Sequence, residues 1–175
     1  EDALLEMIAG ISDRRISRPD ALRVPAVMKA RNVIAGVPAT MPINVHNRDR
    51  TISDRTSVVT DPDPDLEKTV VYSLTFEDLL FHGRSYWRAL RWVEGFPANA
   101  RHLDHRSVSQ HQILGMPSEV VSEDHQFTTR DPVFVDGEPV LNPREIIRFI
   151  SPNPPLLTHA AKAIRVALLL DRAAE

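Results

Sequence analysis

Two histidines three positions apart are the best candidates for metal chemistry in this sequence. His102 and His105 flank Asp104, and His111 follows. Imidazole and carboxylate groups are zinc ligands, and bound zinc activates water, so His102, Asp104 and His105 could serve a metal-assisted hydrolase. We place this segment on a strand, where odd spacing sends the two imidazoles to opposite faces. We therefore favour solvated or hydrogen-bonded histidines over a metal site.

Three aspartates alternate with prolines at 61–65, and their carboxylates suggest a calcium-binding site. An EF-hand loop also needs a glycine turn and a bidentate glutamate at its end, and neither is present here. Each proline removes a backbone donor, so the segment reads as a turn. We predict that Asp65 is the N-cap of the helix that follows.

Glu77 is an acidic residue in the apolar sector of that helix. A buried carboxylate can act as a general acid, or it can pair with a cation. No second carboxylate or nucleophile can be identified beside it, and arginine is abundant in this chain. We predict a structural ion pair with arginine.

Aromatic and basic residues interleave on one predicted strand. They are Tyr86, Trp87, Arg88, Arg91 and Trp92. A single-stranded nucleic-acid-binding module could use the Tyr86–Trp92 strand as a stacking platform. We favour packing in the core, because large aromatic side chains most often serve there.

Several chemistries lack their residues. The chain has no cysteine, so disulfides and thiolate catalysis are excluded. Its six glycines form no dinucleotide-binding fingerprint, phosphate-binding loop or nucleophile elbow. The net charge of −3 gives the average surface no attraction for nucleic acid, and no apolar run approaches the roughly 20 residues that cross a bilayer. We expect no enzymatic activity, no catalytic, cofactor-binding or metal-binding residue, no cofactor and no membrane partner.

Two helices are predicted in the first half of the chain, and they must help to position these side chains. Residues 12–20 read as a polar loop that ends in an Arg-Pro-Asp signal. A helix follows from Pro25 until Gly36 and Pro38 end it, and its predicted apolar face comprises Val27, Ala30, Ile34 and Val37. Residues 41–46 alternate like a strand. The core helix is predicted over 66–82 with a glycine stop at 83, and its polar sector comprises Glu67, Lys68, Thr75 and Asp78.

The second half reads as short strands and a final helix. Strands are predicted at 85–93, 100–108 and 146–150, with weaker candidates at 119–121 and 126–128. Asp136-Gly137 predicts a hairpin within 133–140, because a type I′ turn needs positive φ angles. The last helix is expected to begin near Thr158, its predicted N-cap.

The elements together predict an α+β fold with a mixed, mostly antiparallel twisted sheet packed against two to three helices. We expect three parts: an N-terminal segment at 1–21, an α+β domain at 22–157 and the start of a helix at 158–175. That last helix is apolar on two sides and lacks a stop signal, and the chain begins at Glu1. We therefore expect that the natural protein is longer than this chain, which is truncated within its C-terminal helix.

The order of these segments resembles the portal proteins of long-tailed bacteriophages. The block DLLFHGRSY at 78–86 is similar to that family's DLLLxGNAY block. Other matching blocks, in family order, are 24–27, 34–43, 61–64, Leu103 with Val108, 143–149 and 160–164. Departures are His105 where the family often has proline, Arg148 where histidine is common, and 153–157 in place of a Gly-Ser pair.

This resemblance implies a structural subunit of a portal ring, the head-tail connector through which DNA is packaged and ejected. The implied assembly is a homo-oligomeric ring, usually a dodecamer, at the portal vertex of a virion that assembles in the host bacterial cytoplasm. Implied partners are the major capsid protein, the terminase, tail connector proteins and double-stranded DNA in the full-length channel. Residues 22–157 would be wing-like, and 158–175 would lead toward the stem. We expect a prophage-encoded protein.

Overall fold

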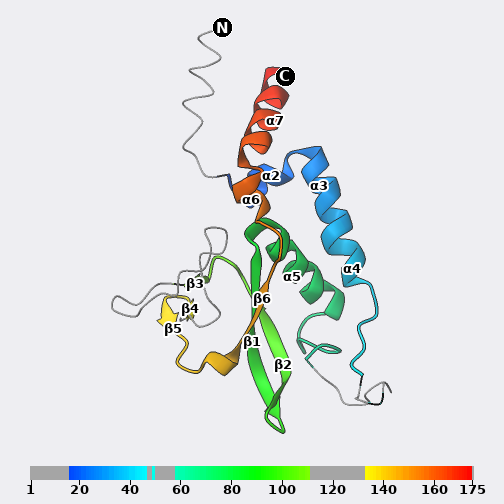
Figure 1. Ribbon diagram of the computed structural model, residues 1–175, viewed down its shortest axis with the longest axis vertical. Helices are drawn as coiled ribbons and strands as arrows, with labels where there is room; N and C mark the ends of the chain where they lie inside the picture. The colour runs from blue at the N-terminus through cyan, green and yellow to red at the C-terminus, as the bar shows by residue number, and fades with distance from the viewer. Residues whose placement is uncertain (1–15, 47–48, 50–57, 111–132, 175) are drawn as a thin grey trace.

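The computed structural model describes residues 16–46, 49, 58–110 and 133–174. Figure 1 shows an elongated molecule in which helix α7 projects at one end and the turn between strands β1 and β2 projects at the other. The strands predicted at 119–121 and 126–128 and the residue His111 lie outside the described residues. Within the described residues, no helix is long and apolar enough to cross a membrane.

Helix α2 (Arg18–Leu22) occupies part of the segment that we predicted as a loop, so that prediction was wrong. Ser17 and Asp20 form a reciprocal capping box in which each side chain accepts the other's backbone N–H. Pro19 lies in the first turn, where a helix needs no donor from it. The residues that we interpreted as a turn signal therefore start a helix.

The next helix continues from α3 (Pro25–Arg31) through a π-helical turn, η1 (Asn32–Gly36), into α4 (Val37–Ala39). It therefore passes the predicted stop at Gly36 and Pro38. A proline ring inside an α-helix crowds the carbonyl four residues earlier, and the wider π turn before Pro38 gives it room.

The predicted apolar face of this helix was wrong except at Val27. The side turned toward the rest of the molecule carries Val27, Arg31, Ala35 and Ala39, whereas Ala30, Ile34 and Val37 are exposed. The π turn adds a residue to the helix and so shifts the phase of its faces. Small alanines consequently lie inside and large apolar side chains lie outside.

The strand predicted at 41–46 is absent apart from an isolated bridge at His46. Ile43 packs on the core as the alternation suggested, but Pro42 removes a backbone donor that a ladder would need.

Helix α5 (Lys68–His82) is the core helix that the sequence predicted, and its glycine stop is confirmed. Gly83 adopts the left-handed conformation with φ 74°. The predicted N-cap Asp65 was wrong, because Glu67 takes that position. The Asp63 side chain instead accepts the Asp65 backbone N–H at 3.0 Å. The acidic segment 61–65 therefore forms a turn just before the helix begins.

The larger sheet has the antiparallel order β2-β1-β6, formed by β2 (Phe96–Leu103), β1 (Arg84–Val93) and β6 (Ile146–Ile150). Only Arg84–Arg88 of β1 pairs with β6, so the far part of the β1–β2 hairpin is a two-stranded ribbon. Trp87 lies opposite His102 on one side and Ile147 on the other. Its side chain packs with α5 residues, so α5 covers this face (Figure 1).

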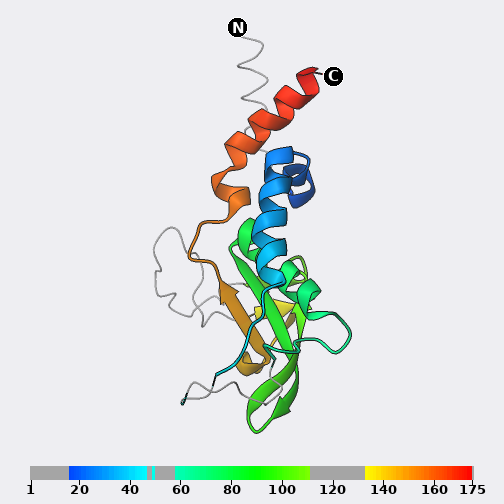
Figure 2. The same cartoon turned by 90° about the vertical axis from the view of Figure 1, so that its right-hand side faces the viewer.

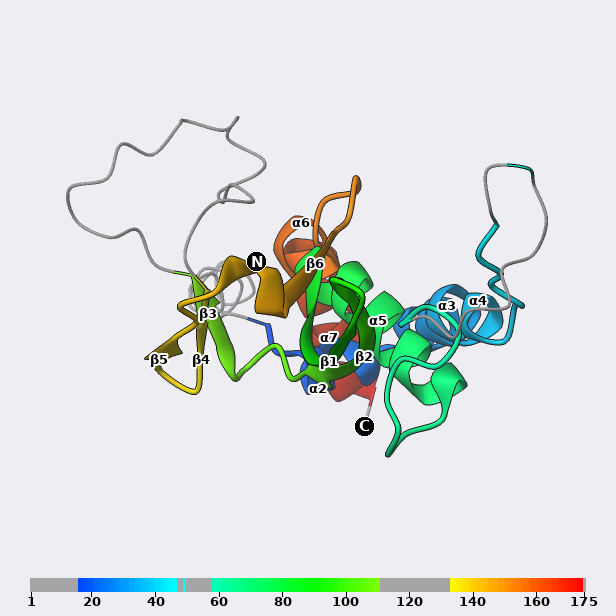
Figure 3. The same ribbon diagram turned by 90° about the horizontal axis from the view of Figure 1, so that it is seen from below.

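A second antiparallel sheet has the order β3-β4-β5, formed by β3 (Val108–Gln110), β4 (Val133–Val135) and β5 (Glu138–Pro139). The predicted Asp136-Gly137 hairpin is confirmed, with φ 52° and 86°. Tyr86 points away from α5 and packs with Val133 and Ile146, which joins the two sheets. Seen from below, this small sheet and α3–α4 lie on opposite sides of the β1–β2 hairpin (Figure 3).

The chain ends in α6 (Leu156–His159) and α7 (Ala161–Ala174) after the short 3-10 turn η2 (Pro143–Glu145) and β6. The N-cap predicted at Thr158 was wrong, because Pro155 precedes the helix and Thr158 is already helical. Ile164 is buried against Ala21 and Phe81. The predicted α+β class with antiparallel strands and a C-terminal helix is confirmed, with two small sheets in place of one.

Candidate functional site

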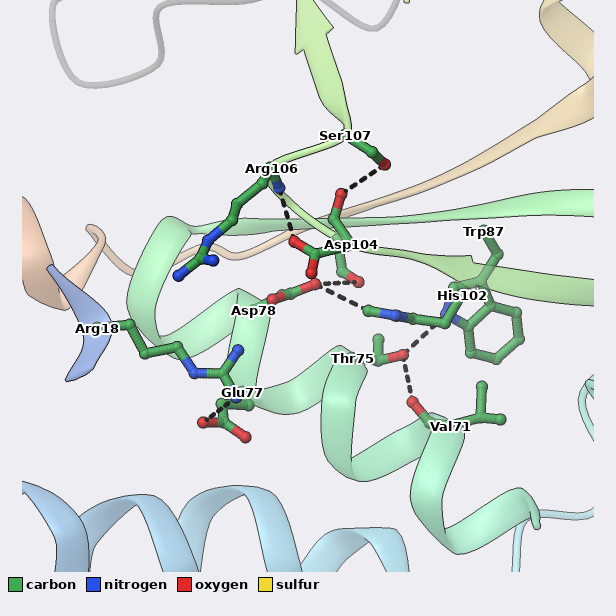
Figure 4. A network of polar contacts seen from close by, with 11 residues as sticks. Arg18, Val71, Thr75, Glu77, Asp78, Trp87, His102, Asp104, Arg106 and Ser107 are labelled. Carbon is green, nitrogen blue, oxygen red and sulfur yellow. Dashed lines mark hydrogen bonds and ion pairs between the residues drawn. The ribbon is translucent and has the colours of Figure 1, made fainter. Parts of the chain in front are cut away.

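Glu77 joins three helices through its carboxylate. Its two oxygens lie 2.7 Å from the Arg18 guanidinium of α2 and 2.6 Å from that of Arg31 in α3. The Glu77 side chain is buried, and the arginines are about one-third exposed. The predicted ion pair is therefore confirmed, and it is a double one. Figure 4 shows its Arg18–Glu77 contact. The ion pair lies between three helices and stabilises their packing. Neither arginine that Glu77 contacts is a partner for acid–base catalysis.

The other side of α5 carries buried polar groups that bind the larger sheet. Trp87 Nε1 donates to Thr75 Oγ1 at 2.8 Å, and that hydroxyl donates to the Val71 carbonyl at 2.8 Å. Asp78 Oδ2 lies 2.8 Å from His102 Nε2 (Figure 4). The sequence placed Thr75 and Asp78 in the polar sector of the helix, and the structure buries both of them against the sheet. Both are satisfied by the strands, because a buried polar group needs a partner.

Ser85, Asp78 and His102 have the residue types of a hydrolytic triad without its geometry. A nucleophilic serine must contact the histidine, which the acid then orients. Here Ser85 Oγ donates to Asp78 Oδ2 at 3.3 Å, the same oxygen that His102 contacts. Ser85 is also only 1% exposed, so a substrate cannot reach it. The hydrogen bonds of this cluster hold α5 against the larger sheet.

The histidines and aspartate of the hydrolase hypothesis do not converge. His102 binds Asp78, Asp104 accepts the Arg106 backbone N–H at 2.8 Å, and His105 stacks on His82. The strand ends at Leu103, so the opposite-face argument fails for His105, which lies in the turn beyond it. Within the described part of the chain, no three His, Asp or Glu side chains could hold a metal ion together.

The acidic turn at 61–65 is held by arginine. Asp63 is buried and lies 3.5 Å from Arg101 Nε, and Asp65 pairs with the Arg101 guanidinium. The Pro62 carbonyl accepts the Ala100 backbone N–H, which ties the turn to β2. These contacts support the turn interpretation over a calcium loop.

The Tyr86–Trp92 strand is divided between core and surface. Tyr86 and Trp87 are buried, as the packing interpretation predicted, whereas Trp92 is 40% exposed. The three large rings therefore do not form an open stacking platform, which removes the main support for the single-stranded nucleic-acid hypothesis.

Exposed apolar side chains gather on the outer side of α3, η1 and α4, which we call the outer helix face. Each is between 47% and 56% exposed, and they are Met28, Val33, Ile34, Val37 and Met41. The helix runs along the molecule beside α5 (Figure 2), and η1 and α4 pack on α5 through their other side, where Ala35 and Ala39 are buried. An apolar patch of this kind marks an interaction surface.

A second apolar group lies at the hairpin tip, which comprises Leu90, Trp92, Val93 and Phe96. Phe96 is 72% exposed, and within the described residues no third strand pairs with the ribbon that carries it. A third group is Val166 and Leu170 on α7, the side opposite to Ile164 and Leu168. The packing confirms that the described chain covers only one of the two apolar sides predicted for that helix.

Comparisons with known proteins give two solved structures of the same fold. A crystal structure of an HK97-family phage portal protein from Corynebacterium diphtheriae is 26% identical, with a TM-score of 0.70, over 91% of this chain and 48% of that one. The neck of an empty GTA particle, computed with C6 symmetry, gives 16% identity and a TM-score of 0.61, over 92% and 46%. This chain thus spans about half the length of each. No family model and no curated protein matches.

Proposed function

We propose that this chain, which belongs to the phage portal protein family, forms the outer part of a subunit in a portal ring, the head-tail connector. The observation that carries the proposal is the 26% identity to a phage portal protein across 91% of the chain. In this assignment residues 22–157 are the wing-like domain, 158–175 begin the helix toward the stem, and 1–21 are an N-terminal segment.

The exposed apolar surfaces support a ring subunit. A closed ring is built by heterologous contacts, in which one surface of a subunit binds a different surface of the next. The outer helix face and the hairpin tip are two such surfaces on separate elements. A ring of twelve subunits also contains a sixfold axis, so the proposed dodecamer is compatible with the C6 symmetry of the similar neck.

The proposed partners follow from the ring's place in the particle. Copies of the same protein form the ring, the major capsid protein surrounds it, and the terminase and the tail connector dock in turn. Double-stranded DNA passes through the channel of the full-length ring. The net charge of −3 suits a part that does not line this channel. The proposed location is the portal vertex of a virion, after assembly in the host bacterial cytoplasm.

The proposed role is structural and without catalysis. The groups with the chemistry for hydrolysis are used in joints: Asp78 binds His102, and Glu77 binds two arginines. A side chain committed to such a joint is not free to move a proton to a substrate.

Localisation within particles tests this function. The protein is tagged in its natural full length, and purified particles are imaged by electron microscopy with a label against the tag. A portal subunit gives label at a single vertex of each particle. Label spread over the whole shell, or absent from particles, would overturn the proposal.

A further inference from the structure

Two histidine rings lie face to face where α5 ends. His82 is in the last turn of α5, and His105 is in the turn that joins β2 to β3. Their ring centroids are 3.7 Å apart with an interplanar angle of 7°. The β2–β3 turn therefore rests on α5 through an imidazole stack.

The turn also carries the small sheet. β3 begins at Val108, and the Ser107 carbonyl accepts the Asp136 backbone N–H at 2.8 Å from the β4–β5 hairpin. The Ser107 hydroxyl donates to the Asp104 carbonyl at 2.9 Å, which closes the turn (Figure 4). His105 and the sheet β3-β4-β5 are thus connected through one short, hydrogen-bonded turn.

Charged groups face the stack from each element around it. They are Arg18 of α2, Asp78 of α5, Arg84 of β1, and His102 and Asp104 of β2 and its turn. The two arginines oppose a positive charge on the rings, and the two aspartates favour it. Asp78 is already hydrogen-bonded to His102, and His105 Nδ1 is buried and has no hydrogen-bond partner among the described residues.

These surroundings keep both rings neutral. Burial and, to a smaller extent, the neighbouring His105 lower the pKa of His82 to about 4. Burial also lowers the pKa of His105. A proton on either ring would place a charge against its partner at stacking distance, and a buried N–H without an acceptor is costly.

We propose that the His82–His105 stack is an acid-sensitive latch that holds the β2–β3 turn and the small sheet on the end of α5. Unfolded histidine has a pKa near 6.5, so the released turn binds protons that the closed latch excludes. The latch contributes fully above about pH 6.5 and is lost as the pH falls toward about 4. This proposal does not depend on the portal assignment.

Hydrogen exchange read segment by segment tests the latch in the whole chain. Protection of 104–110 and 133–139 is measured at about pH 7.5 and about pH 4.5, corrected for intrinsic exchange, with α5 as the internal reference. We expect protection of the two segments to fall by about tenfold or more on acidification, while α5 changes less. His105→Phe keeps a stacking ring that cannot bind a proton and leaves His82 as the one titrating ring of the stack, so the fall should be clearly smaller in it.

His159→Gln is the matched control, because His159 is exposed on α6 and is not one of the groups that shift the pKa of either stacked ring. It should behave as the wild type does. His82→Phe repeats the test if His105→Phe does not fold. Undiminished protection in the acidified wild type, or an equal fall in the His→Phe variants, would overturn the latch.

Discussion

Glu77 and Asp78 are neighbours in α5, yet they bind partners on opposite sides of the helix. Glu77 pairs with Arg18 and Arg31, and Asp78 binds His102 and Ser85. The sequence predicted the first pairing, because an acid in an apolar sector needs a cation. It could not predict the second, since a helical wheel does not show that a strand from later in the chain supplies the histidine.

Removal of the Glu77 charge tests the three-helix joint. We expect Glu77→Gln to lower the free energy of unfolding by about 2 kcal/mol or more, because two part-buried arginines lose their counter-charge. Urea unfolding monitored by circular dichroism measures it. The control is Glu145→Gln, whose pair with Arg88 is exposed at 3.4 Å and is expected to contribute less than about 1 kcal/mol. Equal losses in the two variants would contradict the joint.

Gly83 and Gly95 distinguish two ways in which an added Cβ atom destabilises a protein, namely backbone strain and contact with a neighbouring side chain. Both have a positive φ, but only at Gly83 would a Cβ meet a neighbour, Pro155 Cγ at 3.3 Å. We expect Gly95→Ala to cost about 1 kcal/mol from backbone conformation, and Gly83→Ala to cost about 2 kcal/mol. Thermal and urea unfolding of the two variants give the difference. A smaller loss at Gly83 than at Gly95 would show that α5 does not abut the segment before α6.

At the scale of elements, the sequence predicted α5, strand β1 and the Asp136-Gly137 hairpin well. Each has a local signal that tertiary contacts reinforce. The helix from Pro25 to Ala39 was predicted to exist, but its faces were assigned incorrectly. A π turn leaves no mark in hydrophobic periodicity, and the choice of small side chains for the inner face depends on how closely α5 approaches.

Substitutions on the two sides of that helix should differ in their cost to the free energy of unfolding. Ala35 is fully buried, so Ala35→Leu overpacks the contact with α5 and should cost about 1–3 kcal/mol. Ile34 is about half exposed, so Ile34→Glu should change stability by less than about 0.5 kcal/mol. Urea unfolding at low protein concentration compares them. A large loss in Ile34→Glu would mean that this side packs within the chain.

At the scale of the whole molecule, polar contacts between elements lie in the interior and several large apolar side chains are exposed. Ion pairs and hydrogen bonds fix α2, α3 and the larger sheet to α5, while the outer helix face, the hairpin tip and one side of α7 stay uncovered. Sequence order suggested the portal family, and the fold agrees with a portal protein at 26% identity. The second apolar side of the last helix was predicted, but the outer helix face and the hairpin tip could not be, because their exposure depends on the packing of elements distant in sequence.

The oligomeric state of the protein in its natural full length tests the central claim most directly. Native mass spectrometry and negative-stain electron microscopy should show closed rings of a single subunit number. The double variant Ile34→Glu, Val37→Glu should fold normally, as judged by circular dichroism, and yet give mostly open or unassembled species, since both residues lie on the outer helix face. Wild-type protein that forms only monomers or twofold dimers under these conditions would contradict the account.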